Sequence, residues 1–200
     1  MSYINNPTEF EEKYNELDSY VKAELSEKRY KHTISVVEEA KRLADLNQMT
    51  VEDTRRVMLA AIFHDAAKEL SDDQMTRLIE KYQLDKKYIG NSNLAHGKLA
   101  SKMIVDLFGI EDKNIINGIS FHTTGRENMS QVEKVVFIAD AIEPLRNYDV
   151  VDEIRKTTWE NLDKGCHKML VETIKMLEKK SKGPIDEDTL LAEQWFREFI

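Results

Sequence analysis

An adjacent histidine and aspartate, His64 and Asp65, interrupt an otherwise apolar run over residues 57–67. A buried carboxylate without a partner is expensive, so it normally pairs with an opposite charge or with a metal ion. His32 and Asp140 lie far away in the sequence, but on similar faces of the helices that the hydrophobic pattern predicts. Two imidazoles and two carboxylates suit a divalent transition metal. The four residues together therefore predict metal-assisted hydrolysis.

Three cationic residues lie near the ends of the segments that carry these four, namely Arg29, Lys68 and Arg146. Lys68 follows Asp65 by three residues, which places its ammonium group on the same face of a helix. Each of the three could equally be a solvated surface residue. Glu143 lies one turn beyond Asp140, where it could orient a ligand or pair with an arginine.

Two further histidines lie at inner or terminal positions of other expected helices. His96 lies on or near the inner face of a helix over residues 91–109, and His122 ends the helix that Asp112 opens. Thr123, which follows, could offer a hydroxyl or an amide to a phosphate oxygen, or simply belong to the end of that helix. A single histidine on an apolar face is more often a packed residue than a ligand. Four histidines in such positions favour a shared site.

Hydrophobic side chains recur at helical intervals along most of the chain. Ser71 and Ser130 each open a capping box, with Gln74 and Glu133 three residues later. No run alternates as a strand requires, and 7 glycines and 3 prolines in 200 residues leave few turns. We therefore expect an all-α fold, a single helical bundle of about eight helices. The clearest segments lie at residues 10–25, 30–46, 57–67, 75–82, 91–109, 112–122, 130–143, 162–177 and 190–196.

The composition narrows the functional classes. A net charge of −8 disfavours a nucleic-acid backbone as the partner, although a small polyanion can still bind a locally cationic pocket. No stretch is apolar and long enough to span a membrane, and we find no signal peptide. The single cysteine, Cys166, is expected to be a small buried hydrophobe, and His167 a surface or packing residue. We expect a cytoplasmic protein in a reducing setting.

With these residues assembled, the chain resembles the HD-domain metal-dependent phosphohydrolases, whose pattern H…HD…D reads here as His32…His64-Asp65…Asp140. The surroundings are more specific than the pattern alone. They read RYKH at 29–32, HDAAK at 64–68, AHG at 95–97, FHTTG at 121–125 and IADAIEPLR at 138–146. This set is similar to the YqeK-type branch of that family, the bacterial symmetrical bis(5′-nucleosyl)-tetraphosphatases. The similarity assigns residues 25–200 to the HD domain and leaves residues 1–24 as an N-terminal helical extension.

The resemblance implies an iron-dependent enzyme that hydrolyses diadenosine tetraphosphate to two ADP molecules. It implies that iron is bound by His32, His64, Asp65 and Asp140, with manganese, cobalt, magnesium or nickel as alternative metals. It implies that the phosphates are contacted by Arg29, Lys68, His96, His122, Thr123 and Arg146. Asp65 and Lys68 would be the catalytic residues, Asp65 as a ligand that could also activate water. His96 and His122 could instead hold a second metal ion, and both roles remain open here.

Two other functions fit the same motif. The nearest is an HD phosphohydrolase that acts on another nucleotide, because the H…HD…D set alone does not select the substrate. The second is a nucleotide-sensing HD module that binds without turnover, although such a module would be expected to lose a ligand and this chain keeps all four. In each case the partner is a small nucleotide rather than a nucleic acid or a membrane. The sequence leaves a monomer and a homodimer both open.

Overall fold

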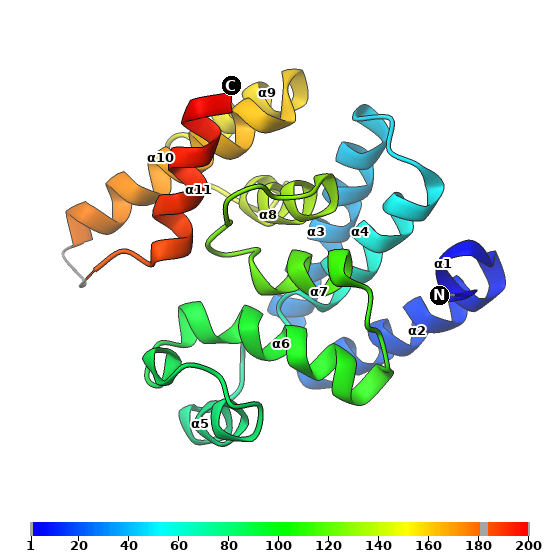
Figure 1. The fold of residues 1–200 in the computed structure, drawn as a ribbon. Helices are drawn as coiled ribbons and strands as arrows, with labels where there is room; N and C mark the ends of the chain where they lie inside the picture. Colours follow the sequence, from blue (N-terminus) through cyan, green and yellow to red (C-terminus); the bar gives the residue numbers. More distant parts are fainter. Residues whose placement is uncertain (1, 181–183, 200) are drawn as a thin grey trace.

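The structure, a computed structural model, describes residues 2–180 and 184–199. Over these ranges it holds eleven α-helices, one short 3₁₀ helix and no strand (Figure 1), which confirms the expected all-α fold. The first part of the chain forms α1 (Ser2–Asn5), α2 (Pro7–Glu24), α3 (Glu27–Leu46), α4 (Val51–Phe63), α5 (Asp72–Lys81) and η1 (Lys86–Tyr88). The rest forms α6 (Ser92–Phe108), α7 (Lys113–Ser120), α8 (Gln131–Ile142), α9 (Val151–Glu160), α10 (Leu162–Lys180) and α11 (Glu187–Phe199).

The core is built around α4, whose last five residues, 59–63, are fully buried. This helix packs against α2, α3, α7 and α8, which surround it (Figure 1). A helix that is hydrophobic nearly all round is expected to lie inside a bundle, because every face then removes apolar surface from water. The helices α9 and α10 pack against α8, and α5 packs against α6 on another side of the molecule.

The ends of several helices follow the signals in the sequence. Both predicted capping boxes are present, because the hydroxyls of Ser71 and Ser130 each accept from the backbone N–H three residues later, and the backbone N–H of each serine donates to the side chain of Gln74 or Glu133. Asp112 opens α7 by accepting from two backbone amides. Gly109 closes α6 with a positive φ of 64°, a conformation that glycine adopts without a steric cost. Asn91 precedes α6 as expected, but its side chain makes no capping bond.

The prediction of one helix through residues 57–67 is wrong at its C-terminal end. α4 stops at Phe63, and the chain continues in tight turns in which Ala66 N–H donates to Phe63 O and Lys68 N–H donates to Asp65 O. Each of these bonds spans three residues rather than the four of an α-helix. Neighbouring residues of a regular helix point about 100° apart. His64 keeps helical backbone angles, with φ −54° and ψ −40°, and the departure from a regular helix begins in the tight turns that follow.

The bundle has more helices than the eight or so expected. The short α1 and the ten-residue α9 carry too few periodic apolar positions to stand out in the sequence, and Asn161, in an extended conformation, separates α9 from α10. Leu17 and Val21 of α2 belong to the same hydrophobic core as the rest of the bundle. The division of the chain at residue 25 stays a prediction. Among the described helices, none is both long and apolar enough to cross a membrane.

Candidate metal centre

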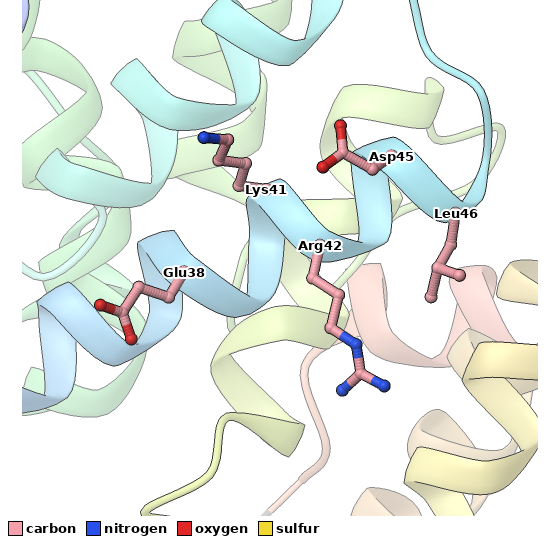
Figure 2. A pocket seen from close by; sticks show the side chains of 5 residues that line it. All are labelled: Glu38, Lys41, Arg42, Asp45 and Leu46. Atoms are coloured by element: carbon pink, nitrogen blue, oxygen red, sulfur yellow. The ribbon is translucent and has the colours of Figure 1, made fainter.

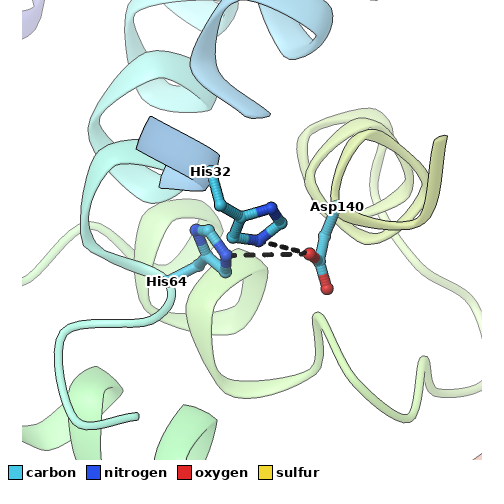
Figure 3. Close-up of side chains that lie close together, drawn as sticks. All are labelled: His32, His64 and Asp140. Atoms are coloured by element: carbon cyan, nitrogen blue, oxygen red, sulfur yellow. Dashed lines mark ion pairs between the residues drawn. The ribbon is translucent and has the colours of Figure 1, made fainter. Parts of the chain in front are cut away.

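Three parts of the chain bring the four predicted ligands together. His32 comes from α3, Asp140 from α8, and the His64-Asp65 pair from the turn after α4. His32 Nε2 lies 3.0 Å from Asp140 Oδ1, and His64 Nε2 lies 3.9 Å from the same oxygen (Figure 3). Asp65 Oδ2 lies 3.5 Å from His64 Nε2 and 3.8 Å from His32 Nε2. The four side chains therefore form one cluster.

The surroundings of His32 and His64 decide which ring nitrogen carries the proton. His64 Nδ1 lies 2.7 Å from the carbonyl oxygen of Ala61, which can only accept a hydrogen bond. His32 Nδ1 lies 2.9 Å from the carboxylate of Glu143, which also accepts. In both rings Nδ1 is thus the donor, and Nε2 of the neutral ring presents a lone pair to the two aspartates. This is the form in which histidine binds a metal ion.

The cluster has the dimensions of a cation site. Nε2 of His32 and Nε2 of His64 are buried and make no hydrogen bond with any described residue. A neutral imidazole and a carboxylate both offer lone pairs, so they repel one another unless a proton or a cation lies between them. Donors that share one metal ion at about 2.0–2.2 Å lie roughly 2.8–4.4 Å apart. The separations of 3.0, 3.5, 3.8 and 3.9 Å all fall in that range.

Both aspartates are held in the ionised form. Burial alone would raise the pKa of Asp65, which is only 3% exposed, but the adjacent His64 outweighs burial and lowers it well below the usual range. Burial would raise the pKa of Asp140 too, but the neighbouring His32 and the charge of Arg146 lower it. The two carboxylates can therefore serve as anionic ligands at neutral pH.

A second pair of histidines completes the other side of Asp65. His96 of α6 places Nε2 3.2 Å from Asp65 Oδ1, and His122 places Nε2 3.8 Å from the same oxygen. The two Nε2 atoms lie 2.9 Å apart. Their Nδ1 atoms face the carbonyls of Ser92 at 2.9 Å and Ile119 at 2.7 Å. Both rings therefore carry the proton on Nδ1 when neutral, and Asp65 lies between two groups of nitrogen donors.

The neutral form of His122 is favoured by its position. Burial, together with the neighbouring His96 and His64, lowers the pKa of His122 to about 3. His64, Asp65 and His122 each offer a ligand atom within 4.8 Å of the others, as do His32, His64 and Asp140. The described residues thus contain two overlapping groups of potential ligands, with His64 common to both.

Gly97 allows the second pair of histidines to approach each other. A Cβ atom at this position would lie 2.9 Å from the carbonyl oxygen of Ile119 and 3.1 Å from the ring of His122. Such distances are shorter than ordinary van der Waals contacts. The glycine that follows His96 is therefore a packing requirement of the site.

The predicted cationic residues surround the same cluster. Arg29 Nη1 lies 2.9 Å from Asp65 Oδ2, and Arg146 Nη2 lies 2.5 Å from Asp140 Oδ1. Lys68 differs, because its one hydrogen-bond contact among the described residues is a long one of 3.5 Å to His96 Nδ1, a nitrogen already bonded to a carbonyl. Burial lowers the pKa of Lys68. The hydroxyl of Thr123 lies 3.2 Å from Nε2 of His122 and completes the predicted set.

Glu143 and Ser35 support His32 from behind. Glu143 Oε1 holds His32 Nδ1, and its Oε2 accepts a bond of 2.7 Å from the hydroxyl of Ser35. A carboxylate behind a ligating imidazole fixes the orientation of the ring and increases its basicity. Of the two roles considered for Glu143, orienting a histidine is the principal one. Ser35 was missed, although its spacing of three residues from His32 on α3 was a usable signal.

The surface pocket in Figure 2 lies elsewhere. It has a volume of about 430 Å³ and is lined by Glu38, Lys41, Arg42, Asp45 and Leu46, all from the C-terminal half of α3. None of the predicted ligands borders it. His167 is also remote from the cluster and pairs with Glu193 at 3.2 Å, and Cys166 is buried as expected.

Comparison with known proteins shows the family to which a chain with this site belongs. A family model described as an HD domain matches residues 29–145, a range that contains His32, the 64–65 pair and Asp140. A protein of Halalkalibacterium halodurans called bis(5′-nucleosyl)-tetraphosphatase, symmetrical, is 41% identical over 172 residues, which cover 85% of this chain and 89% of that protein. A protein of Bacillus subtilis with the same name is 34% identical over 176 residues, covering 88% and 92%.

A solved structure has the same fold. It is described as a predicted HD superfamily hydrolase involved in NAD metabolism, from Clostridium acetobutylicum. It is 36% identical to this chain, and the superposition covers 92% of this chain and 97% of that one with a TM-score of 0.84.

Proposed function

We propose that this chain, which belongs to the HD-domain family, hydrolyses diadenosine tetraphosphate symmetrically to two ADP molecules with the help of a divalent metal. The observation that carries the proposal is the cluster of two buried imidazoles with two aspartates, in which Nε2 of both rings has no hydrogen-bond partner among the described residues. The substrate is supported by the names of relatives at 34% and 41% identity that align over most of their length.

The metal would be bound by His32, His64, Asp65 and Asp140. Imidazole and carboxylate ligands together suit iron, and they also accept manganese, cobalt, nickel or magnesium, so iron is proposed on the family resemblance rather than on the donor set. A cation held there supplies Lewis acidity and lowers the pKa of a water molecule towards 7. A cytoplasmic location and the choice between monomer and homodimer stay predictions.

His96 and His122 suit a second cation better than a phosphate. Their Nε2 atoms lie 2.9 Å apart, and both rings carry the proton on Nδ1 when neutral. Two neutral acceptors at this distance would repel a phosphate oxygen, and the low pKa of His122 keeps that ring neutral. Asp65, with one oxygen towards each group of histidines, has the arrangement of a bridging ligand.

The pKa of Asp65, which the neighbouring His64 lowers, supports one of the two roles considered for this residue. A carboxylate whose pKa lies well below the usual range is a poor proton acceptor near neutral pH. Both of its oxygens have partners, Oδ1 with His96 and Oδ2 with Arg29. We therefore assign Asp65 to ligation rather than to removing a proton from water.

The cations around the cluster would bind the tetraphosphate. Metal ions bound to Asp65 and Asp140 would weaken the ion pairs that these aspartates form with Arg29 and Arg146. The planar guanidinium groups of the two arginines could then bind phosphate oxygens in pairs. Lys68 has no carboxylate within salt-bridge distance and can act as a point charge on a phosphate. Positive charge on both sides of the central anhydride stabilises the transition state, in which negative charge increases on the departing ADP.

The products test this proposal directly. Protein purified without oxygen and loaded with iron is expected to convert diadenosine tetraphosphate to ADP alone, and His64→Ala and Asp65→Ala should lose both the metal and the turnover. A mixture of ATP and AMP would mean asymmetric cleavage and would contradict the proposal. Tight nucleotide binding with no product would favour a nucleotide-sensing module, and faster hydrolysis of another nucleotide would favour a different specificity.

A further inference from the structure

Arg155 of α9 is a largely buried cation that the proposed chemistry does not use, since its side chain is only 16% exposed. Its Nε atom donates a hydrogen bond of 2.8 Å to the carbonyl oxygen of Ile142. Its Nη2 atom donates to the carbonyl oxygens of Glu143 at 2.8 Å and Arg146 at 2.9 Å. One guanidinium group thus binds three backbone carbonyls of a five-residue segment.

The carbonyl of Glu143 also accepts from Arg146 N–H at 2.9 Å, but those of Ile142 and Arg146 accept from no backbone N–H among the described residues and need a partner from outside the segment. α8 ends at Ile142, and the last carbonyls of any helix have no partner within it. Pro144 prevents the helix from continuing, so the next carbonyls cannot join a regular pattern either. A planar group with five N–H donors in a fixed arrangement can satisfy several of them at once, which a lysine could not do.

The same segment carries two side chains that reach the metal cluster. Glu143 holds Nδ1 of His32, and Arg146 binds both the carboxylate and the backbone carbonyl of Asp140. The backbone atoms that Arg155 holds therefore belong to the residues that orient two proposed ligands. Among the described residues, the Arg155 side chain donates hydrogen bonds to the 142–146 segment and to Asp152, and none to the cluster itself.

We propose that Arg155 is a positioning residue, which fixes residues 142–146 so that Glu143 and Arg146 hold their partners in the geometry that binds metal and phosphate. The inference rests on the proposed function and adds a requirement that α9 be docked on α8. If Arg155 only closed the end of α8, its replacement would lower the stability of the fold without a specific effect on metal affinity.

The test compares Arg155→Ala with a control on the same guanidinium. Asp152 pairs with Arg155 Nη1 at 2.8 Å but is 89% exposed, and its side chain makes no hydrogen bond or ion pair with the 142–146 segment. Asp152→Ala removes this pair and leaves the three backbone bonds in place. It is expected to behave as the unsubstituted protein in every assay below.

Two quantities are measured on folded protein. The first is the affinity for Co²⁺ alone, followed by its visible absorption in competition with a chelator, which needs no substrate. The second is kcat/KM for diadenosine tetraphosphate. We expect Arg155→Ala to weaken Co²⁺ binding by about tenfold, the lower end of the effect of groups that orient metal ligands, and to lower kcat/KM by at least as much. Millimolar guanidinium chloride should restore part of both losses, because the free ion can occupy the vacated position.

Co²⁺ affinity and kcat/KM within twofold of the unsubstituted values would overturn the inference, as would losses that guanidinium does not reverse. If Arg155→Ala does not fold, Arg155→Lys serves in its place, and unsubstituted values for that variant would overturn the inference equally. Failure of the unsubstituted protein to bind Co²⁺ or to release ADP would instead refute the proposed function. The two failures are therefore distinguishable.

Discussion

Replacing Gly97 by alanine tests whether the close approach of α6 and α7 is a requirement of the site. The added Cβ would lie 2.9 Å from the carbonyl oxygen of Ile119, which is the acceptor for Nδ1 of His122. Ordinary contact begins at 3.4 Å, so the two helices must separate by 3.4 − 2.9 = 0.5 Å. The substitution thus acts on the hydrogen bond that orients His122.

The expected effects on stability and activity differ. Overpacking costs about 1–3 kcal/mol, and replacing a helical glycine by alanine returns about 1 kcal/mol, so the free energy of unfolding should fall by about 0–2 kcal/mol. A misplacement of 1 Å can cost about a hundredfold in rate, so half of that distance should cost about tenfold in kcat/KM. We expect Gly97→Ala to remain folded at assay temperature and to lose activity about tenfold.

The assay needs a variant with a similar loss of stability and an intact site. Ile104 lies on the same helix and is fully buried, and its apolar side chain offers the cluster neither a ligand atom nor a hydrogen bond. Ile104→Val should cost about 0.5–1.5 kcal/mol by removing one buried methyl group. Denaturant unfolding and ADP release are measured on both variants. Full activity of Gly97→Ala, or an equal loss of activity in Ile104→Val, would refute the reasoning.

Three further predictions follow from other contacts. Glu143→Gln should weaken metal binding by about 10–100-fold in a chelator competition, because the carboxylate no longer holds His32 Nδ1, and unchanged affinity would contradict this role. Lys68→Met should lower kcat by about a hundredfold while elemental analysis finds the usual metal content, whereas loss of metal would make Lys68 part of the metal site. Cys166 should resist a thiol reagent at pH 8 until the protein is denatured, because burial raises the pKa of its thiol; rapid reaction of native protein would count against the packing around it.

Much of the fold could be predicted because local signals were strong. The hydroxyls of Ser71 and Ser130 stand three residues before a side chain that completes the capping box, and Pro144 permits no continuation of α8. The end of α4 could not be predicted in the same way. Residues 57–67 contain no glycine or proline that would mark the end of a helix, yet α4 stops at Phe63 and tight turns follow.

The candidate site, too, could be predicted only in part. The type and spacing of His32, His64, Asp65 and Asp140 are visible in the sequence, and the turns and helices do bring these residues together. The protonation of each ring depends on backbone carbonyls such as that of Ala61, which carry no residue-type signal. Arg155 was not predicted for the same reason, because all its bonds towards the site go to backbone oxygens.

The proposed hydrolysis depends most on a single metal ion bound by all four predicted ligands. Crystals grown with iron under nitrogen, with anomalous diffraction recorded at the iron absorption edge, test this point directly. We predict a peak at about 2.0–2.2 Å from Nε2 of both His32 and His64 and from a carboxylate oxygen of both Asp65 and Asp140. Iron-loaded crystals with no peak at this position, or with Asp140 turned away from it, would contradict the account.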